Sequence, residues 1–206
     1  MNTQADRIAP LRTFVQSMTR LVEGTREEAA LLAAARPLLA QLIADDGWLP
    51  EDCTRPDAQF YCQYLLHCDP LERFCVVSFV WGPGQSTPIH DHTVWGLVGM
   101  LHGAERCRRY VRDAQGALQA AGGEQVLNPG DIEAVSPTVG DIHTVANALA
   151  DAPSISIHVY GANIGAVRRH VFDGATGAAK DFVSGYSSAS VPNLWDRSAA
   201  VRAAAA

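Results

Sequence analysis

The chain has 206 residues, of which 48% are hydrophobic and 18% are charged, a balance typical of a folded domain and unlike that of a long disordered chain. Its formal net charge of −6 excludes an extended basic surface, so we expect no nucleic-acid partner. The sequence has neither a secretory signal nor a run approaching the roughly 18 apolar residues of a membrane-spanning helix. We therefore expect a cytoplasmic protein with no membrane partner and one domain over residues 1–206.

Residues 1–47 are predicted to be an N-terminal helical segment because apolar side chains recur there at the period of an α-helix. Thr25 followed by Glu28 has the form of a capping box, which predicts that a helix begins at this point. Pro37 predicts a kink or a break further along. The apolar positions that define the first helical face are Leu11, Phe14, Val15, Met18, Leu21 and Val22.

From residue 59 the pattern changes to short segments rich in β-branched and aromatic residues, separated by turn residues. Because no helix-length segment separates them, they predict an antiparallel sandwich or barrel over residues 59–195 rather than a parallel sheet. The Ala-rich end, residues 196–206, is expected to be a flexible tail. The predicted strands are Phe74–Trp81, Gly96–Leu101, Glu105–Val111, Glu124–Leu127, Ile132–Ser136, His143–Asn147, Ile155–Tyr160 and Arg168–Phe172.

Three histidines predict a metal site. His90 and His92 are two residues apart, so both rings leave the same face of an extended segment. His143 follows a turn rich in Pro and Gly and begins another predicted strand, which a barrel would bring close to the first pair. Imidazole suits zinc, copper, nickel and iron, so the spacing alone does not identify the metal.

These histidines resemble the ligands of the cupin superfamily. Residues 137–147 fit the second cupin motif with one extra residue between Pro137 and Gly140, and Gly96 stands where the first motif carries its Glu ligand. The resemblance implies a jelly-roll-like antiparallel β-barrel, preceded here by N-terminal α-helices, with three histidines left as ligands. The residues that fit the first motif are Gly84, His90, His92 and Gly103.

Ser156, His158 and Tyr160 occupy alternate positions of one predicted strand, so they share a face on which a hydrogen-bond chain can form. They resemble the catalytic Ser-x-His-x-Tyr triad of thiol dioxygenases, the cysteine dioxygenase type I family. The resemblance implies a mononuclear Fe(II) cofactor and oxidation of a small thiol by O2 to a sulfinic acid. The sulfur then supplies all four electrons, and both oxygen atoms end on it.

Gly96 also stands where animal-type cysteine dioxygenases carry the Cys that crosslinks to the triad tyrosine, so Tyr160 is expected to be unmodified. Those enzymes anchor substrate with an Arg in a region where this chain has Gln63. Arg168 and Arg169 instead resemble the carboxylate-binding Arg of the 3-mercaptopropionate dioxygenase subgroup, with Arg169 as the match and Arg168 left open. The resemblance implies a thiol carboxylate substrate, 3-mercaptopropionate or L-cysteine, and the corresponding sulfinate as product.

Two interpretations from other classes remain open. A three-histidine zinc or nickel cupin could be a hydrolase, lyase or isomerase, because zinc held by three histidines ionises a bound water. A non-catalytic cupin could instead sense or store a small ligand. The oligomeric state is not predicted.

Overall fold

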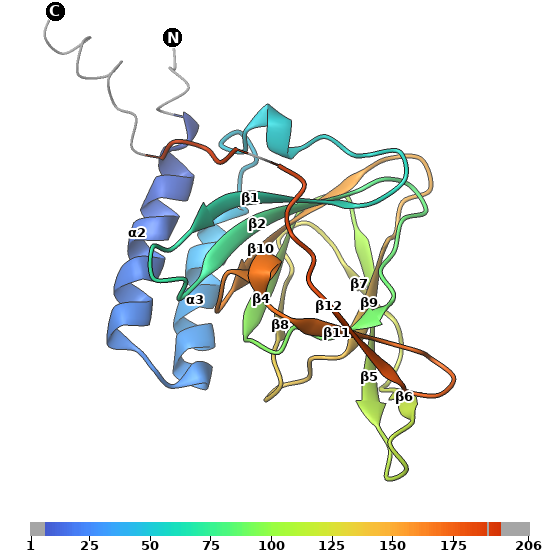
Figure 1. Cartoon of the computed structure of the whole chain (residues 1–206). Helices are drawn as coiled ribbons and strands as arrows, with labels where there is room; N and C mark the ends of the chain where they lie inside the picture. The colour runs from blue at the N-terminus through green and yellow to red at the C-terminus, as the bar shows by residue number, and fades with distance from the viewer. Residues whose placement is uncertain (1–6, 189, 195–206) are drawn as a thin grey trace, which may run out of the picture.

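The computed structural model describes residues 7–188 and 190–194, and it places two helices against one side of a barrel of antiparallel strands (Figure 1). The predicted tail over residues 196–206 lies outside the described residues. None of the helices within the described ranges combines the length and the apolar character needed to cross a bilayer.

Two antiparallel sheets form the barrel, and neighbouring strands in space are often distant in sequence (Figure 1). This strand order confirms the predicted antiparallel β-barrel of the cupin type, preceded by N-terminal helices. The first sheet contains, in spatial order, β1 (Cys62–Cys68), β2 (Cys75–Trp81), β10 (Ser154–Tyr160), β4 (Gly96–His102) and β8 (Ile132–Val135). The second contains β12 (Ala179–Phe182), β11 (Arg169–Phe172), β3 (Ile89–His90), β9 (His143–Asn147), β5 (Glu105–Arg112) and β6 (Leu118–Ala120), and β7 (Gln125–Leu127) also pairs with β5.

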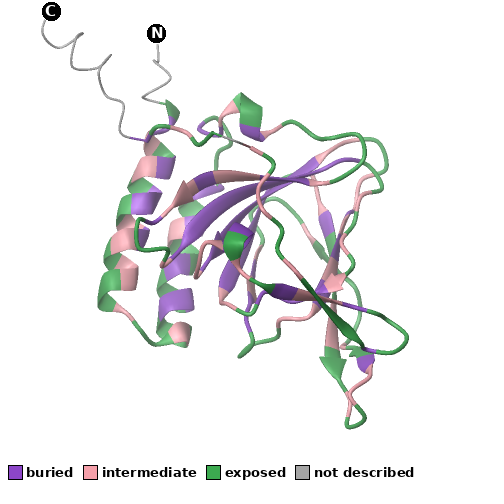
Figure 2. Cartoon of the chain, in the orientation of Figure 1, coloured by how far each residue is buried: buried purple, intermediate pink, exposed green. Residues whose placement is uncertain are grey.

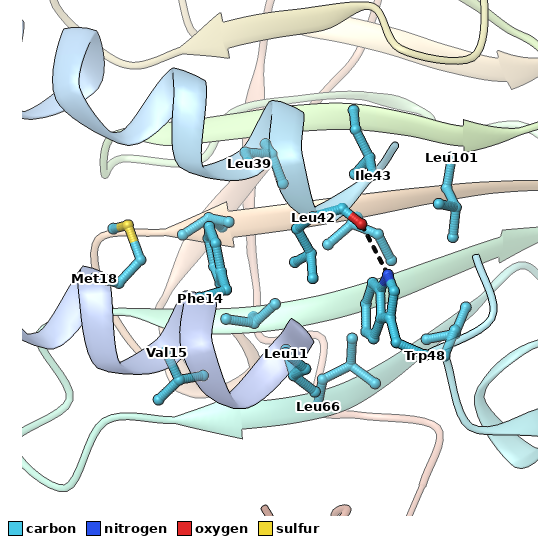
Figure 3. Close-up of a cluster of buried hydrophobic side chains, with 14 of the residues drawn as sticks. Leu11, Phe14, Val15, Met18, Leu39, Leu42, Ile43, Trp48, Leu66 and Leu101 are labelled. Carbon is cyan, nitrogen blue, oxygen red and sulfur yellow. Dashed lines mark hydrogen bonds between the residues drawn. The ribbon is translucent and has the colours of Figure 1, made fainter. Parts of the chain in front are cut away.

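Helices α2 (Ala9–Gly24) and α3 (Glu28–Leu42) cover the outer face of the first sheet and bury it (Figures 1 and 2). In the resulting core, Trp48 packs with the helices and donates from Nε1 to the Leu42 carbonyl at 2.8 Å (Figure 3). The described residues also contain two short 3-10 helices, Glu51–Cys53 and Ile164–Ala166.

The two central strands of the first sheet, β2 and β10, are buried on both faces, which decides where the functional side chains point. Successive side chains of a strand alternate between faces. On β10, Ile155, Ile157 and Val159 face the helices in one apolar cluster. The intervening residues therefore face the barrel interior, and among them Tyr160 packs in a second, separate apolar cluster.

The residue predicted to cap the second helix is wrong. Glu27, not Thr25, is the N-cap of α3, because its carboxylate accepts from the backbone amides of Ala29 at 2.9 Å and Ala30 at 2.7 Å. The helix also continues through Pro37 without a break. Loss of one backbone hydrogen bond is outweighed because residues before and after the proline, including Leu39, are buried against the sheet.

Four strands were not predicted, namely β1, β3, β6 and β12. Strands β3 and β6 contain only two and three residues, too short for an alternating pattern to appear. Strand β12 is exposed at three of its four positions and lies at the edge of the second sheet. Strand β1 is half-buried with a bulge between Leu65 and His67, which interrupts its alternation.

Candidate metal centre

The three predicted ligands come together between β3 and β9. His90 pairs directly with His143 across these antiparallel strands, and His92 follows two residues after His90. One ring nitrogen of each histidine lies within 4.8 Å of those of the other two, and all three residues are buried. The ring centroids are 4.8 to 5.0 Å apart, so the imidazoles form a nearly regular triangle.

Each imidazole has its Nδ1 occupied by a neighbouring group, which leaves Nε2 for a metal. His90 Nδ1 lies 3.1 Å from the Pro88 carbonyl, and His92 Nδ1 lies 2.9 Å from the Asp141 carboxylate. His143 Nδ1 instead faces the Cys107 sulfur at 3.4 Å. Such partners orient the rings and raise their basicity, as is usual around protein metal sites.

The Asp141 carboxylate also shapes the loop that carries His92. Its second oxygen accepts the backbone amides of His92 at 3.1 Å and Thr93 at 2.9 Å. Thr93 has a positive φ of 59°, an unusual conformation for a β-branched residue that this anchoring helps to maintain. Burial favours a raised pKa for Asp141, but the hydrogen bonds from His92 and the backbone outweigh it and lower the pKa.

Burial disfavours the charged forms of His90 and His143. Burial, followed by the proximity of His92, lowers the pKa of His90 to about 3. Burial and the other ring charges likewise hold the pKa of His143 well below its ordinary value. An imidazole that binds a metal through Nε2 is a neutral ligand, so three buried histidines suit a divalent transition metal and leave its charge uncompensated.

The Ser156, His158 and Tyr160 side chains form a continuous hydrogen-bond chain inside the barrel. The Ser156 hydroxyl lies 2.8 Å from His158 Nε2, and His158 Nδ1 lies 2.8 Å from the Tyr160 hydroxyl. Tyr160 stacks on His92 with ring centroids 5.4 Å apart, which places the outer end of the chain beside the ligands. Burial lowers the pKa of His158 well below its ordinary value and raises that of Tyr160, so both are neutral.

Gly96 lies directly opposite Tyr160 in the pairing of β4 with β10. An ideal Cβ on Gly96 would lie 2.7 Å from Tyr160 Cδ1, closer than ordinary packing allows. The tyrosine ring therefore occupies the space that a side chain at this position would need.

A cavity of about 170 Å³ is lined by the three histidines, by His158 and Tyr160 of the triad, and by Arg169. This volume suits a ligand smaller than the drug-sized molecules that occupy pockets of roughly 300–1,000 Å³. Arg169 is 4% exposed, donates from Nη2 to Ser184 Oγ at 2.7 Å, and has no partner for its Nε among the described residues. Its guanidinium lies 4.6 Å from the centroid of the Phe182 ring.

The structure separates the other two candidate substrate contacts. Gln63 lines the cavity, where its side-chain amide donates to the Gly185 carbonyl. Arg168 does not line it. Its side chain is 74% exposed and forms an ion pair with Asp181 at 2.9 Å.

Several residues of this site were not identified from the sequence. Asp141 lies inside the second histidine motif, where its two-residue separation from His143 was an available signal. Most of the other lining residues come from strands and the rest from loops, and sequence pattern does not predict their proximity to the histidines. The lining residues that sequence reasoning missed are Tyr61, Phe79, Trp81, Thr87, Pro88, Val145, Val171 and Phe182.

No protein-family model matches the chain. Among solved structures, it is similar to a protein from Thermus thermophilus, with 19% identity and a TM-score of 0.42 over 54% of this chain and 92% of the other. A double-stranded β-helix protein from Klebsiella pneumoniae has 21% identity and a TM-score of 0.41 over 56% and 89%. A cupin superfamily protein from Desulfitobacterium hafniense has 16% identity and a TM-score of 0.39 over 56% and 95%.

The strand order and the site together define the class. The chain is a cupin-fold barrel with a buried cluster of three histidines that could bind a metal ion.

Proposed function

We propose that this protein is a non-haem Fe(II) thiol dioxygenase. It oxidises 3-mercaptopropionate, L-cysteine or both with O2 to the sulfinic acid. The observation that carries the proposal is one small cavity lined by three histidines, by a buried arginine whose Nε has no partner among the described residues, and by His158 and Tyr160 of the Ser-His-Tyr hydrogen-bond chain. The reaction balances, because sulfur gives the four electrons that O2 accepts and both oxygen atoms end on sulfur.

Arg169 supports a carboxylate-bearing substrate. A buried guanidinium is costly unless an anion meets it, and its planar fork pairs with carboxylates through two parallel hydrogen bonds. No Asp or Glu is among the described residues that line the cavity, so a bound carboxylate would be the counter-charge. The same absence leaves no partner charge for the ammonium group of cysteine, which favours 3-mercaptopropionate.

His90, His92 and His143 would hold the iron through their Nε2 atoms, and imidazole, a neutral ligand when it binds a metal, suits a site that must also accept an anionic sulfur. Iron held there would supply a redox-active Lewis acid with coordination positions left open. The surrounding residues restrict water: Phe79 stacks on His158 with centroids 4.1 Å apart, and Tyr61 stacks on Trp81 at 4.6 Å.

Tyr160 holds a proton at the cavity surface. Burial keeps its phenol protonated, and its hydroxyl lies 2.8 Å from His158 Nδ1. A neutral phenol can donate a hydrogen bond to substrate atoms without adding charge to the site. Ser156 and His158 orient that phenol from the interior side.

The test is anaerobic titration of the iron-loaded protein with 3-mercaptopropionate, L-cysteine and cysteamine, followed by oxygen and product analysis. We expect sulfinate from the two thiol carboxylates, one O2 consumed per sulfinate, and a higher kcat/KM for 3-mercaptopropionate. Cysteamine has no carboxylate, so its preference over both others would refute the role of Arg169. If fully iron-loaded protein consumed no O2 with any of the thiols, the dioxygenase proposal would fail.

A further inference from the structure

Glu105 is a buried acid that the proposed function does not use. It begins β5, is 0% exposed, and neither carboxyl oxygen makes a hydrogen bond with another described residue. Glu105 and Cys107 are buried whereas Arg106 and Arg108 are exposed, so alternation points Glu105 into the barrel. A fully buried carboxyl group without partners is expensive, and in most proteins such a group has a specific role.

Two polar groups face this carboxyl group, the Ser156 hydroxyl and the Trp81 indole. They lie beyond ordinary hydrogen-bond geometry, yet both are close enough to lower the pKa of Glu105. Burial acts more strongly in the opposite direction and raises that pKa to about 8, so Glu105 is mostly protonated at neutral pH. Ser156 is also the inner end of the hydrogen-bond chain that runs through His158 to Tyr160. Glu105 would therefore extend this hydrogen-bond chain by one group beyond Ser156.

The number of donors and acceptors around Glu105 determines which group donates to which along the hydrogen-bond chain. The Trp81 N–H is a donor only and also lacks a partner among the described residues, so it complements the carbonyl oxygen of the acid. Of these two polar groups, only the Ser156 oxygen can accept the acid proton. If Ser156 donated to Glu105 instead, the acid proton would remain buried without an acceptor.

We propose that Glu105 is a positioning residue, whose carboxylic acid donates to Ser156 and thereby sets the direction of the whole hydrogen-bond chain. Ser156 then donates to His158 Nε2, and His158 donates from Nδ1 to the Tyr160 oxygen. The phenol O–H is left to donate into the cavity that Tyr160 lines. Every group keeps one proton, so no oxidant, reductant or further acid is required.

Without Glu105 the opposite direction becomes favourable. Tyr160 would donate to His158 Nδ1, and His158 would donate from Nε2 to Ser156. The phenol would then present only its oxygen lone pair to a bound ligand. Only the importance of this direction for turnover rests on the proposed function, because the direction itself belongs to the folded protein whatever its reaction.

The decisive experiment locates the ring proton of His158 by nitrogen NMR of the zinc-loaded protein, which is diamagnetic, with ¹⁵N-labelled histidine. A His158→Asn variant assigns the resonance. We expect the proton on Nδ1 in the unaltered protein and in Glu105→Gln, whose amide still donates to Ser156. In Glu105→Leu, which has no donor, we expect the proton on Nε2.

A proton on Nε2 in the unaltered protein would overturn the inference, whether or not any variant folds. So would the same tautomer in the unaltered protein and Glu105→Leu. Ser154→Ala is the matched control, because Ser154 is a buried residue of the same strand whose hydroxyl has no partner among the described residues. Its His158 tautomer should be unchanged.

Activity provides a second measurement on the iron-loaded protein. Glu105→Leu should lower kcat roughly 10- to 100-fold with little change in KM, a part of the ~10²–10⁴ that a positioned proton donor contributes. Glu105→Gln and Ser154→Ala should stay within about twofold of the unaltered protein. Failure of the unaltered protein to oxidise any thiol would refute the proposed function while the NMR result still decides the role of Glu105.

Discussion

Arg168 and Arg169 are neighbours in sequence with opposite environments. Gly161 and Gly165 interrupt the strand pattern before them, so the sequence could not decide which one faces the barrel. In the structure Arg169 is 4% exposed and lines the cavity, whereas the Arg168 side chain is 74% exposed. Substituting each arginine in turn therefore tests whether Arg169 binds the substrate carboxylate, with the neighbouring Arg168 as the control.

Arg169→Ala should raise KM for 3-mercaptopropionate by roughly 10- to 150-fold, because a charge-assisted hydrogen bond to a buried partner contributes about 1.5–3 kcal/mol. Arg168→Ala removes only an exposed ion pair with Asp181, worth about 0–1 kcal/mol of stability, and should leave KM unchanged. Steady-state kinetics on both iron-loaded variants make the comparison. An equal effect of the two substitutions would contradict the assignment.

Gly96 is important because it has no side chain. The expectation that Tyr160 needs no crosslinked cysteine came from a resemblance, but the requirement for glycine follows from packing against the tyrosine ring. Gly96→Ala should reduce the free energy of unfolding by about 1–3 kcal/mol, because the added methyl group forces the Tyr160 ring to move. The displaced phenol should also lower kcat.

Gly123→Ala is the control for that change, since an added Cβ there meets nothing within 4 Å. Its effect on unfolding should stay within about 0.5 kcal/mol, as for most surface substitutions. Urea denaturation of both variants measures the difference. A Gly96→Ala protein as stable as the unaltered one would show that the site has room for a side chain.

At the scale of elements, the β1–β2 hairpin shows how one ion pair can hold a connection. Asp69 is 2% exposed and accepts from Arg73 Nε and Nη2, each at 2.8 Å, and from the Leu71 amide at 3.0 Å. Glu72 adopts a positive φ of 54° within the same turn. The carboxylate thus satisfies several donors of a turn whose backbone is partly strained.

This hairpin predicts a pH dependence of stability. The hydrogen bond from Arg73 lowers the pKa of Asp69 from 3.8 to about 2, so the folded state favours the ionised form. Ionised Asp69 contributes about 2 kcal/mol to the free energy of unfolding. This contribution is complete above the pKa of Asp69 in the unfolded chain, near 4, and disappears as the pH falls through about 2. Asp69→Asn should therefore be about 2 kcal/mol less stable at pH 7, with a difference that shrinks between pH 4 and pH 2.

Denaturant unfolding of the two proteins across this pH range measures the effect. Asp52→Asn is the control, because its pair with Arg55 has side chains 83% and 63% exposed and should contribute little. A constant difference between Asp69→Asn and the unaltered protein down to pH 2 would show that ionisation of Asp69 is not the cause.

The helices were predicted from the helical period and the strands from their composition and the turn residues between them. Each strand that was predicted lies within one residue of its expected bounds, including the short β7, β8 and β11, because β-branched and aromatic residues between turn residues marked them; these strands are β2, β4, β5, β7, β8, β9, β10 and β11. Strand β3, by contrast, exists through its pairing with β9 and β11, and two residues carry no period. The cap of α3 was misplaced because Glu27 and Thr25 can both cap a helix and only the backbone path distinguishes them.

At the scale of the whole molecule, the site is the place where distant segments meet. The triad was recognisable because its three members lie on one strand. The histidines were recognisable because His90 and His92 are only two residues apart. Phe182 and Glu105 reach the barrel interior from other strands and Tyr61 from the residue before β1, and nothing local marks them. Their proximity follows from strand order, which hydrophobic patterning does not specify.

Because the histidines join β3 to β9, a bound metal should stabilise the entire barrel. A ligand that binds only the folded state adds about 2.7 kcal/mol at 100 times its Kd, which for a chain of this size raises Tm by about 5–10 °C. Zinc or iron(II) should produce this shift, and a chelator should reverse it. His143→Ala should abolish most of it, since it removes one of the three ligands.

His102→Ala is the matched control, because His102 is an exposed histidine at the end of β4. Among the described residues, one group of side chains could hold a metal ion, and it consists of the three histidines. The metal-dependent rise in Tm should therefore survive the loss of His102. Thermal unfolding of the three proteins with metal and with chelator decides the matter. If His143→Ala kept the full shift, the stabilising metal would be bound elsewhere and the three histidines would not be its ligands.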